Sequence, residues 1–244
     1  MLNPDVCLDM DHLLPIVLLI VAVLLVIVAR KLTVTGGMVG GLIACGIYTG
    51  AGYAGIAMLG TFFLLGVLAT HWKRKEKELR AGVEPEANRR TAGQVLANGG
   101  VAALTGLGAY LFPDYAVLMN IAMAGSLAAA TADTLSSELG MVYGRRFVNA
   151  ITWKEDVCGE NGVISLEGTL IGVAGCTVIA AIYCFDNGLD ISFLWIVVAG
   201  TAGNWVDSIA GATIERKELV GNNLVNTLNT TAGALTAIAL EMIW

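Results

Sequence analysis

The sequence predicts an all-α protein, a polytopic transmembrane helical bundle of about eight spans with both termini on the outer side of the membrane. Three observations predict it: a composition poor in charge, a series of apolar runs, and positive charges confined to every second connection. Of the 244 residues, 56% are hydrophobic and only 14% are charged, and the mean hydropathy is +0.73. Soluble domains carry roughly 25% charged residues. This chain therefore lacks the charge needed to cover a water-facing surface.

The apolar runs support the number of spans. A transmembrane helix needs about 20 residues, so eight spans use about 160 and leave only short connections. We therefore expect residues 1–244 to form a single integral membrane domain with no separate soluble part. The runs lie at residues 12–29, 34–50, 52–70, 92–112, 116–138, 164–184, 191–212 and 223–244.

The first three runs each raise a question. Asp5, Asp9 and Asp11 stand where a secretory signal peptide would carry positive charge, so we expect the first run to be a retained helix. The second run is rich in glycine, which suits close helix packing in a bilayer. Only the glycines near position 50 separate the second run from the third, and a single kinked segment is the alternative there.

The positive charges orient the spans. All 14 Lys and Arg residues lie in four segments, at 30–31, 73–90, 145–154 and 216–217. With eight spans these segments are every second connection, and the other connections and both termini contain no Lys or Arg. Because Lys and Arg concentrate in cytoplasmic loops, the four basic connections are predicted inside. We expect a multi-pass protein of the cell's inner (plasma) membrane.

Polar residues gather at the ends of spans that this topology places inside. The outer halves of the same spans are nearly all Ala, Val, Leu, Ile and Gly. Function is therefore expected at the cytoplasmic face. The five polar clusters are RRTAGQVLANGG (89–100), ATADTLSSELG (130–140), GENGVISLEGT (159–169), GNWVDSIAGATIER (203–216) and GNNLVNTLNTT (221–231).

Helical spacing aligns several of these polar side chains. Gln94 and Asn98 are four residues apart and Asn204 and Asp207 are three apart, so each pair shares a helix face. Amides that faced lipid would leave polar groups unsatisfied, so they must face the bundle interior, a water-filled pocket or a ligand. The longest stripe of this kind runs along the last span and consists of Asn222, Asn226, Asn229 and Thr230.

Carboxylates at the inner ends of the spans are candidates for a magnesium site. A charged side chain at mid-bilayer costs about 2.5–3.5 kcal/mol on insertion scales, so such residues are functional candidates by default. Carboxylates bind Mg²⁺, which is completed by waters and substrate phosphates, and Arg and Lys bind the phosphates themselves. Asp133, Glu138 and Asp207 are the candidate ligands, whereas Glu167 follows a loop and is expected to face water.

Several familiar chemistries are absent from the sequence. It contains no P-loop, HExxH or GxSxG pattern. Its five cysteines form no CxxC pair, and we interpret them as small apolar residues.

Each candidate also has a structural alternative. The basic run HWKRKEKELR (71–80) is typical of an amphipathic stretch that faces lipid headgroups. The asparagine stripe of the last span could join helices by hydrogen bonds without binding a ligand. Asp133 and Asp207 would each pair with an Arg. The hydroxyls of Thr134, Ser136 and Ser137 would bond only to their own helix.

The five clusters resemble, in the same order, the signatures of a widespread integral membrane family once labelled as being of unknown function. Its plant members include the chloroplast phytyl-phosphate kinase. The similarity runs from about residue 33 to the C-terminus. The resemblance implies a kinase that acts on a polyprenyl or phytyl monophosphate and uses a nucleoside triphosphate, CTP, with Mg²⁺ as cofactor. The motif positions to which it points are Asn98, Asp133, Glu138, Ser165, Asp207 and Asn226.

The residues and the resemblance lead to one first hypothesis, an isoprenoid-phosphate kinase. Asp133, Asp207 and Asn98 are its predicted catalytic residues, and Asp133, Glu138 and Asp207 its metal ligands. A phosphate oxygen is already anionic near neutral pH, so a monophosphate acceptor needs no general base. The predicted substrate- and phosphate-binding residues are Arg89, Arg90, Gln94, Lys154, Ser165, Asn204, Asn223, Asn226 and Asn229.

Two alternatives stay open. A cytidylyltransferase that makes a CDP-lipid needs the same metal- and phosphate-binding groups. A lipid or solute transporter would place polar residues in mid-membrane, whereas here they cluster at one face. The expected partners are a lipid phosphate, a nucleoside triphosphate and membrane lipids, with no nucleic acid. Whether the chain forms a homo-oligomer is left open.

Overall fold

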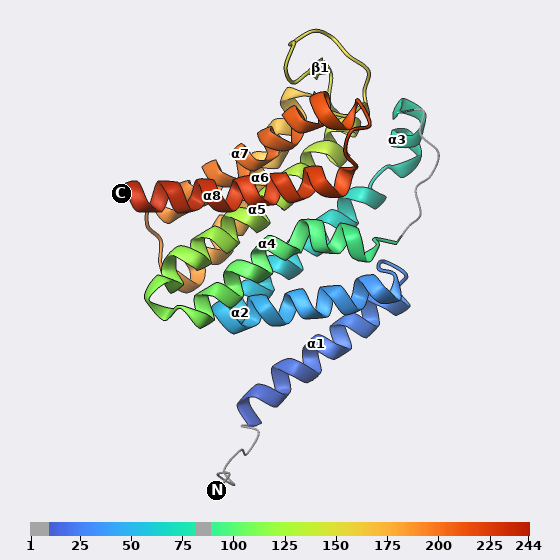
Figure 1. The fold of residues 1–244 in the computed structure, drawn as a ribbon. Coiled ribbons are helices and arrows are strands. Elements are labelled where there is room, and N and C mark those ends of the chain that lie inside the picture. Colours follow the sequence, from blue (N-terminus) through green and yellow to red (C-terminus); the bar gives the residue numbers. More distant parts are fainter. Residues whose placement is uncertain (1–9, 82–88) are drawn as a thin grey trace, which may run out of the picture.

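The computed structural model describes residues 10–81 and 89–244, and these are helical apart from one two-stranded hairpin and the connections (Figure 1). The predicted all-α fold class is therefore confirmed. The helices are α1 (Met10–Val28), α2 (Val34–His71), α3 (Arg74–Ala81), α4 (Ala92–Leu111), α5 (Ala116–Tyr143), α6 (Leu166–Asn187), α7 (Ser192–Ala210) and α8 (Asn222–Ile243), with short turns η1 (Pro113–Tyr115) and η2 (Gly211–Glu215) and strands β1 (Val148–Asn149) and β2 (Val163–Ile164).

Four helical segments are long and apolar enough to cross a membrane, judged by length and composition within the described residues. They are Val34–His71, Pro113–Tyr143, Leu166–Asn187 and Ser192–Glu215, and the apolar part of α1 is shorter. The count of eight spans and the outer position of the termini stay predictions. Residues 1–9, on which the position of the N-terminus depends, lie outside the described residues.

α2 is a hairpin of two helical limbs. A straight helix of its 38 residues would be about 57 Å long. Yet Nζ of Lys31, just before the helix, lies 2.8 Å from Nε2 of His71 at its end. Gly52 has φ 55° and ψ −138°, a conformation that side-chain-bearing residues rarely adopt. Figure 1 shows the ribbon turning back in its middle. The second and third predicted runs are thus the two limbs of one element.

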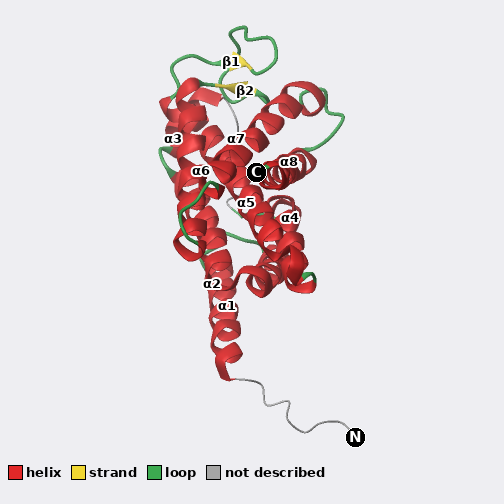
Figure 2. Cartoon of the chain, turned by 90° about the vertical axis from the view of Figure 1, so that its left-hand side faces the viewer, coloured by secondary structure: helices red, strands yellow, loops and turns green. Residues whose placement is uncertain are grey.

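α5 forms the centre of the bundle. In its most apolar stretch 67% of the residues are buried, against 22% for α2. Every residue from Ile121 to Ala132 is buried. Most of these residues are Ala, Gly or Ser, and small side chains let neighbouring helices approach closely. α4, α6, α7 and α8 pack around this helix (Figure 2).

Buried hydroxyl and amide groups join α8 to its neighbours. Nδ2 of Asn229 donates to the carbonyl of Ala129 on α5, 3.4 Å away. Oγ1 of Thr230 donates to the carbonyl of Ala97 on α4, 3.2 Å away. Both side chains are fully buried. For these two positions of the asparagine stripe, the structure agrees with the alternative of a helix-joining role.

The four basic connections meet at one end of the bundle. Lys77 of α3 donates to the carbonyls of Ala69 and Thr70 at the end of α2, 2.9 Å each, and pairs with Glu138 of α5. Arg216 binds Asp156, with 2.7 Å between Nη1 and Oδ2. Arg145 lies 3.8 Å from Glu167 at the start of α6. The polar clusters predicted for this end are therefore neighbours.

Three helices begin at this end with a hydroxyl cap. The side chain of Thr33 accepts from the Gly36 N–H at the start of α2, and Ser165 does the same for Gly168 at the start of α6. Thr91 and Gln94 form a reciprocal capping box at the start of α4. Such caps satisfy backbone N–H groups that have no partner inside the helix, so part of each polar cluster specifies a helix start.

Candidate functional site

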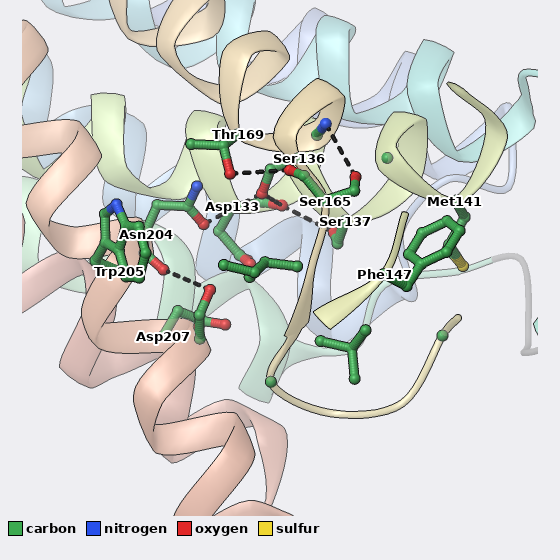
Figure 3. Close-up of a pocket in the computed structure, with 17 residues that line it drawn as sticks. Asp133, Ser136, Ser137, Met141, Phe147, Ser165, Thr169, Asn204, Trp205 and Asp207 are labelled. Carbon is green, nitrogen blue, oxygen red and sulfur yellow. Dashed lines mark hydrogen bonds between the residues drawn. The ribbon is translucent and has the colours of Figure 1, made fainter. Parts of the chain in front are cut away.

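A polar pocket of about 140 Å³ lies at the basic end of the bundle, between α5, α6 and α7 (Figure 3). The segment between α5 and α6, which carries the β1–β2 hairpin, covers it. Its polar lining comes from three helices and one helix cap. These residues are Asp133, Ser136 and Ser137 of α5, Ser165 and Thr169 at the start of α6, and Asn204, Asp207 and Ser208 of α7.

Two carboxylates meet in this pocket. The carboxyl groups of Asp133 and Asp207, on α5 and α7, lie within hydrogen-bonding reach of one another. Among the described residues neither has an ion-pair partner, and Oδ1 of Asp207 is buried without a hydrogen-bond donor. Two like charges so close cannot both stay ionised without compensation. The pair therefore needs a shared proton or a bound cation. The structural alternative, in which each of these aspartates pairs with an Arg, is therefore wrong for the described residues.

Hydrogen bonds fix the surroundings of the acid pair. Oγ of Ser136 donates to Oδ1 of Asn204, 3.2 Å away, and so links α5 to α7. Oγ of Ser137 bonds only to the backbone of its own helix, as the structural alternative expected. Oγ of Ser208 donates to the Asn204 carbonyl at 3.0 Å. The carboxylates thus sit on two helices that are tied together beside them.

The helix departs from α-helical geometry after Ala210, about one turn beyond Asp207. Residues Gly211–Glu215 form a π-helix, and π-bulges within α-helices occur frequently at functional sites. Glycines allow the covering segment to approach here, because a Cβ on Gly211 would lie 2.8 Å from the backbone nitrogen of Gly162. The cover therefore rests on the π-helix.

An ion pair holds the covering segment to η2. Asp156 binds Arg216, and the guanidinium together with the Val157 N–H holds the pKa of Asp156 below its ordinary value of 3.8. Trp153 of the same segment lies against Trp205 of α7, with 5.9 Å between ring centroids. Trp205 also lines the pocket, so it offers an aromatic face at the pocket wall.

Four predicted site residues come together in the pocket. They are Asp133, Asn204 and Asp207, from spans that the sequence analysis placed at the inner face, and Ser165, to which the family resemblance pointed.

Glu138, the third predicted metal ligand, lies elsewhere. It pairs with Lys77, of which only 5% is exposed. Within the described ranges no group of three or more His, Cys, Asp or Glu residues could hold a metal. The structure therefore brings together two of the three candidate ligands. At Lys77 the structure departs from the expected headgroup-facing role of the basic run, because this side chain is buried against α2 and α5. Lys73, Lys75 and Arg80 of the same run are exposed.

The other predicted binding residues lie outside the polar pocket. Arg89 and Lys154 are exposed, and so is Asn223, beside Gly93. Gln94 caps α4, Asn226 is half-buried on α8, and Asn229 joins α8 to α5.

Arg90 and Asn98 line a second, apolar cavity of about 180 Å³ between α1, α2 and α4. The guanidinium of Arg90 lies 5.6 Å from the ring centroid of Phe62. It makes no hydrogen bond or ion pair with the described residues, although the charges of Glu138 and Asp133 act on it. Nδ2 of Asn98 donates to the Gln94 carbonyl at 2.9 Å, while its buried Oδ1 has no partner.

Some lining residues were not predicted. Thr169 and Ser208 stand inside two of the polar clusters, so the cluster pattern contained their signal. Phe147 and Trp205 gave none, because aromatic residues are common at membrane interfaces for other reasons.

The comparisons with known proteins agree with this architecture. The family described as integral membrane protein DUF92 matches residues 17–234. Protein VTE6, chloroplastic, from Arabidopsis thaliana is 30% identical over 230 residues, which cover 89% of this chain and 69% of that protein. Uncharacterized membrane protein MJ0933 from Methanocaldococcus jannaschii is 32% identical over 190 residues, 78% of this chain and 77% of that protein. No solved structure matches.

Proposed function

The chain belongs to the DUF92 family of integral membrane proteins, which includes the plant phytyl-phosphate kinase, and on that premise we propose that it is a membrane-embedded kinase. It transfers a phosphoryl group from a nucleoside triphosphate, CTP in our proposal, to an isoprenoid lipid monophosphate. The observation that carries the proposal is the acid pair of Asp133 and Asp207, buried in a polar pocket at the end of the bundle where the basic connections gather.

In this proposal the pocket faces the cytoplasm. The chain crosses the membrane eight times, with α1, both limbs of α2, α4, α5, α6, α7 and α8 as the spans. The positive-inside rule then puts the basic connections inside and both termini outside. The nucleotide arrives from the cytoplasm, and the lipid arrives from the bilayer.

The acid pair fits a magnesium ion. Mg²⁺ is usually bound by one or two protein carboxylates and completed by waters and substrate phosphates, so Asp133 and Asp207 suffice without Glu138. Neither forms an ion pair with a described residue, and Oδ1 of Asp207 has no hydrogen-bond donor among them. When bound, Mg²⁺ would neutralise charge on the transferring phosphates.

The chain's own residues position the reactants. An oxygen of the lipid phosphate attacks the γ-phosphorus, the bond from that phosphorus to the bridging oxygen breaks, and the nucleoside diphosphate leaves with the electron pair. Arg90 holds the acceptor phosphate. The hydroxyls of Thr169 and Ser208, which donate to backbone carbonyls one turn earlier, rotate to donate to phosphate oxygens of the donor. Trp205 offers its ring to the base. No general base is required because the attacking oxygen is already anionic.

Product analysis tests the proposal. Purified protein is incubated with γ-labelled CTP or ATP and a panel of prenyl monophosphates, and the lipid and nucleotide products are resolved. We expect label in a lipid diphosphate, with release of the nucleoside diphosphate. Release of pyrophosphate with a CDP-lipid would instead make the protein a cytidylyltransferase. Lipid movement across proteoliposomes without any nucleotide, and without transfer, would favour a transporter.

A further inference from the structure

The apolar cavity between α1, α2 and α4 has two polar residues in its lining, Arg90 and Asn98. On α1 its lining runs from Leu19 to Val26, eight residues that span about 10 Å along the helix. On α2 it extends over both limbs. Among its described lining residues Arg90, just before α4, is the only charged one, and Asn98 lies in the second turn of α4. Gly60 lines the cavity and is exposed, so the cavity opens at the surface of the bundle.

Each of these two residues has a polar group without a partner among the described residues. The guanidinium of Arg90 lies beside the Phe62 ring and binds no carboxylate among the side chains that the structure describes. Asn98 is only 7% exposed, and its Oδ1 accepts no hydrogen bond from the described part of the chain. A half-buried charge without an ion-pair partner is costly, and so is a buried amide oxygen without a hydrogen bond. An anionic group with a hydroxyl, such as a phosphate monoester, would satisfy both.

The guanidinium of Arg90 is close to the acid pair of Asp133 and Asp207. A Cβ on Gly66 of α2 would lie 2.8 Å from Nη2 of Arg90 and 3.4 Å from Cγ2 of Thr134. The guanidinium therefore lies between α2 and α5, beside the residue that follows Asp133. The negative charge of Asp133 acts on it. A phosphate bound by Arg90 would lie between the apolar cavity and the polar pocket.

We infer that this cavity binds the single hydrocarbon chain of a lipid monophosphate, and that Arg90 and Asn98 hold its phosphate at the inner end. The inference rests on the proposed function and adds the site for the chain. The apolar side chains of the cavity fix the position of the hydrocarbon chain. The guanidinium of Arg90 supplies the positive charge that pairs with the phosphate. The chain enters from the bilayer beside α1, which lies at the edge of the bundle (Figure 1).

Photo-crosslinking tests the site without requiring turnover. The probe is a C20 prenyl monophosphate with a diazirine at its far end, added to the full-length protein in detergent micelles. We expect labelled peptides from 19–26 and 56–63, and competition by unlabelled prenyl monophosphate. Labelling confined to other segments would overturn the inference, and so would equal competition by phosphatidic acid, which has two chains.

A cavity-filling variant and a matched control sharpen the test. A Cβ on Gly60 would meet nothing within 4 Å, so Gly60→Leu fills the cavity without a backbone clash. Leu64→Trp adds comparable bulk to the same helix at a side chain that is 57% exposed and lies outside the cavity. We expect Gly60→Leu to reduce labelling at least tenfold and Leu64→Trp to leave it within twofold. Equal effects would overturn the cavity as the site.

A second comparison tests recognition of the phosphate. It uses the monophosphate probe and the corresponding prenyl alcohol with the same diazirine. In the wild type we expect the phosphate to label at least ten times more strongly. In Arg90→Met this ratio falls towards one, and an unchanged ratio would remove Arg90 from the site. Labelling at the expected peptides without phosphoryl transfer would reject the kinase and leave the chain site standing. Transfer without that labelling would reject only the chain site.

Discussion

Lys77 and Glu138 form the most buried ion pair of the basic end. Lys77 also donates to the carbonyls of Ala69 and Thr70, so its three donor positions are all used. Breaking a buried pair by removing one partner costs about 3–5 kcal/mol, because an uncompensated charge remains. We therefore assign this pair to stability.

Lys77→Met should lower the free energy of unfolding by about 3–5 kcal/mol, measured by denaturant or thermal unfolding in detergent. Lys73→Met is the control, because its pair with Glu76 is exposed and exposed pairs contribute about 0–1 kcal/mol. Similar losses in the two variants would contradict the assignment of Lys77.

Asp156 gives the covering segment its pH dependence. Arg216 holds the pKa of Asp156 below 3.8, so this carboxylate is more stable when charged in the folded protein. Its contribution is therefore complete above about pH 3.8 and is lost as pH falls through the lowered pKa. Between pH 5 and 8, roughly, docking of the segment should not change.

The docking can be followed by tryptophan fluorescence, because Trp153 of the covering segment packs against Trp205 of α7 when the segment is docked. We expect a flat signal at neutral and mildly acidic pH, a change in strong acid, and a constant undocked signal in Asp156→Asn. Glu155→Gln is the matched control, since its pair with Arg146 is exposed on both sides, and it should behave as the wild type. Docking that persists in Asp156→Asn would contradict this role.

At the scale of single residues the sequence predicted the pocket in part. Asp133, Asn204 and Asp207 were predictable because carboxylates and amides inside apolar runs need an interior or a ligand. The pairing of Glu138 with Lys77 was not predictable, because Lys77 lies in a run whose alternating charges are typical of a solvated helix. Pairing between residues 61 positions apart is set by packing, which local patterns do not contain.

α2 depends on one residue for its reversal. Gly52 combines positive φ with a ψ of −138°, a region almost restricted to glycine. Strain of this kind costs about 1–3 kcal/mol for another residue.

Gly52→Ala should therefore lower the free energy of unfolding by about 1–3 kcal/mol. Gly60→Ala, in regular helix of the same element with open space around it, should leave stability unchanged or raise it by up to about 1 kcal/mol. Unfolding in detergent measures both. A Gly52→Ala protein as stable as Gly60→Ala would show that the reversal needs no glycine.

Element by element, hydropathy predicted the helices well, and α5 extends only a few residues beyond its predicted run. The Gly-rich boundary near position 50 left a hairpin and a kink as alternatives, because either satisfies the same hydropathy. The β1–β2 hairpin was not predicted. Its strands have two residues each, too few to produce an alternating pattern.

For the whole molecule, the charge pattern predicts which connections share a compartment. The structure places the basic connections at one end, so we expect single cysteines at Lys75, Lys154 and Lys217 to react from the cytoplasmic side only. Cysteines at Tyr53 and Asp114 should react only from outside. An impermeant maleimide applied to spheroplasts and to inverted vesicles distinguishes them, in a background without native cysteines. Reaction of the three lysine positions from different sides would contradict the shared compartment.

The kinase proposal depends on the acid pair of Asp133 and Asp207, and rates of phosphoryl transfer by variants of these two residues are its decisive test. Initial rates from γ-labelled nucleoside triphosphate to a prenyl monophosphate would be compared for the wild type, Asp133→Asn and Asp207→Asn. We predict that each substitution lowers the rate at least about a hundredfold, because each removes one of the two proposed Mg²⁺ ligands. The protein should remain folded, because each substitution also removes one of two adjacent like charges. Transfer at the wild-type rate by either folded variant would contradict the account.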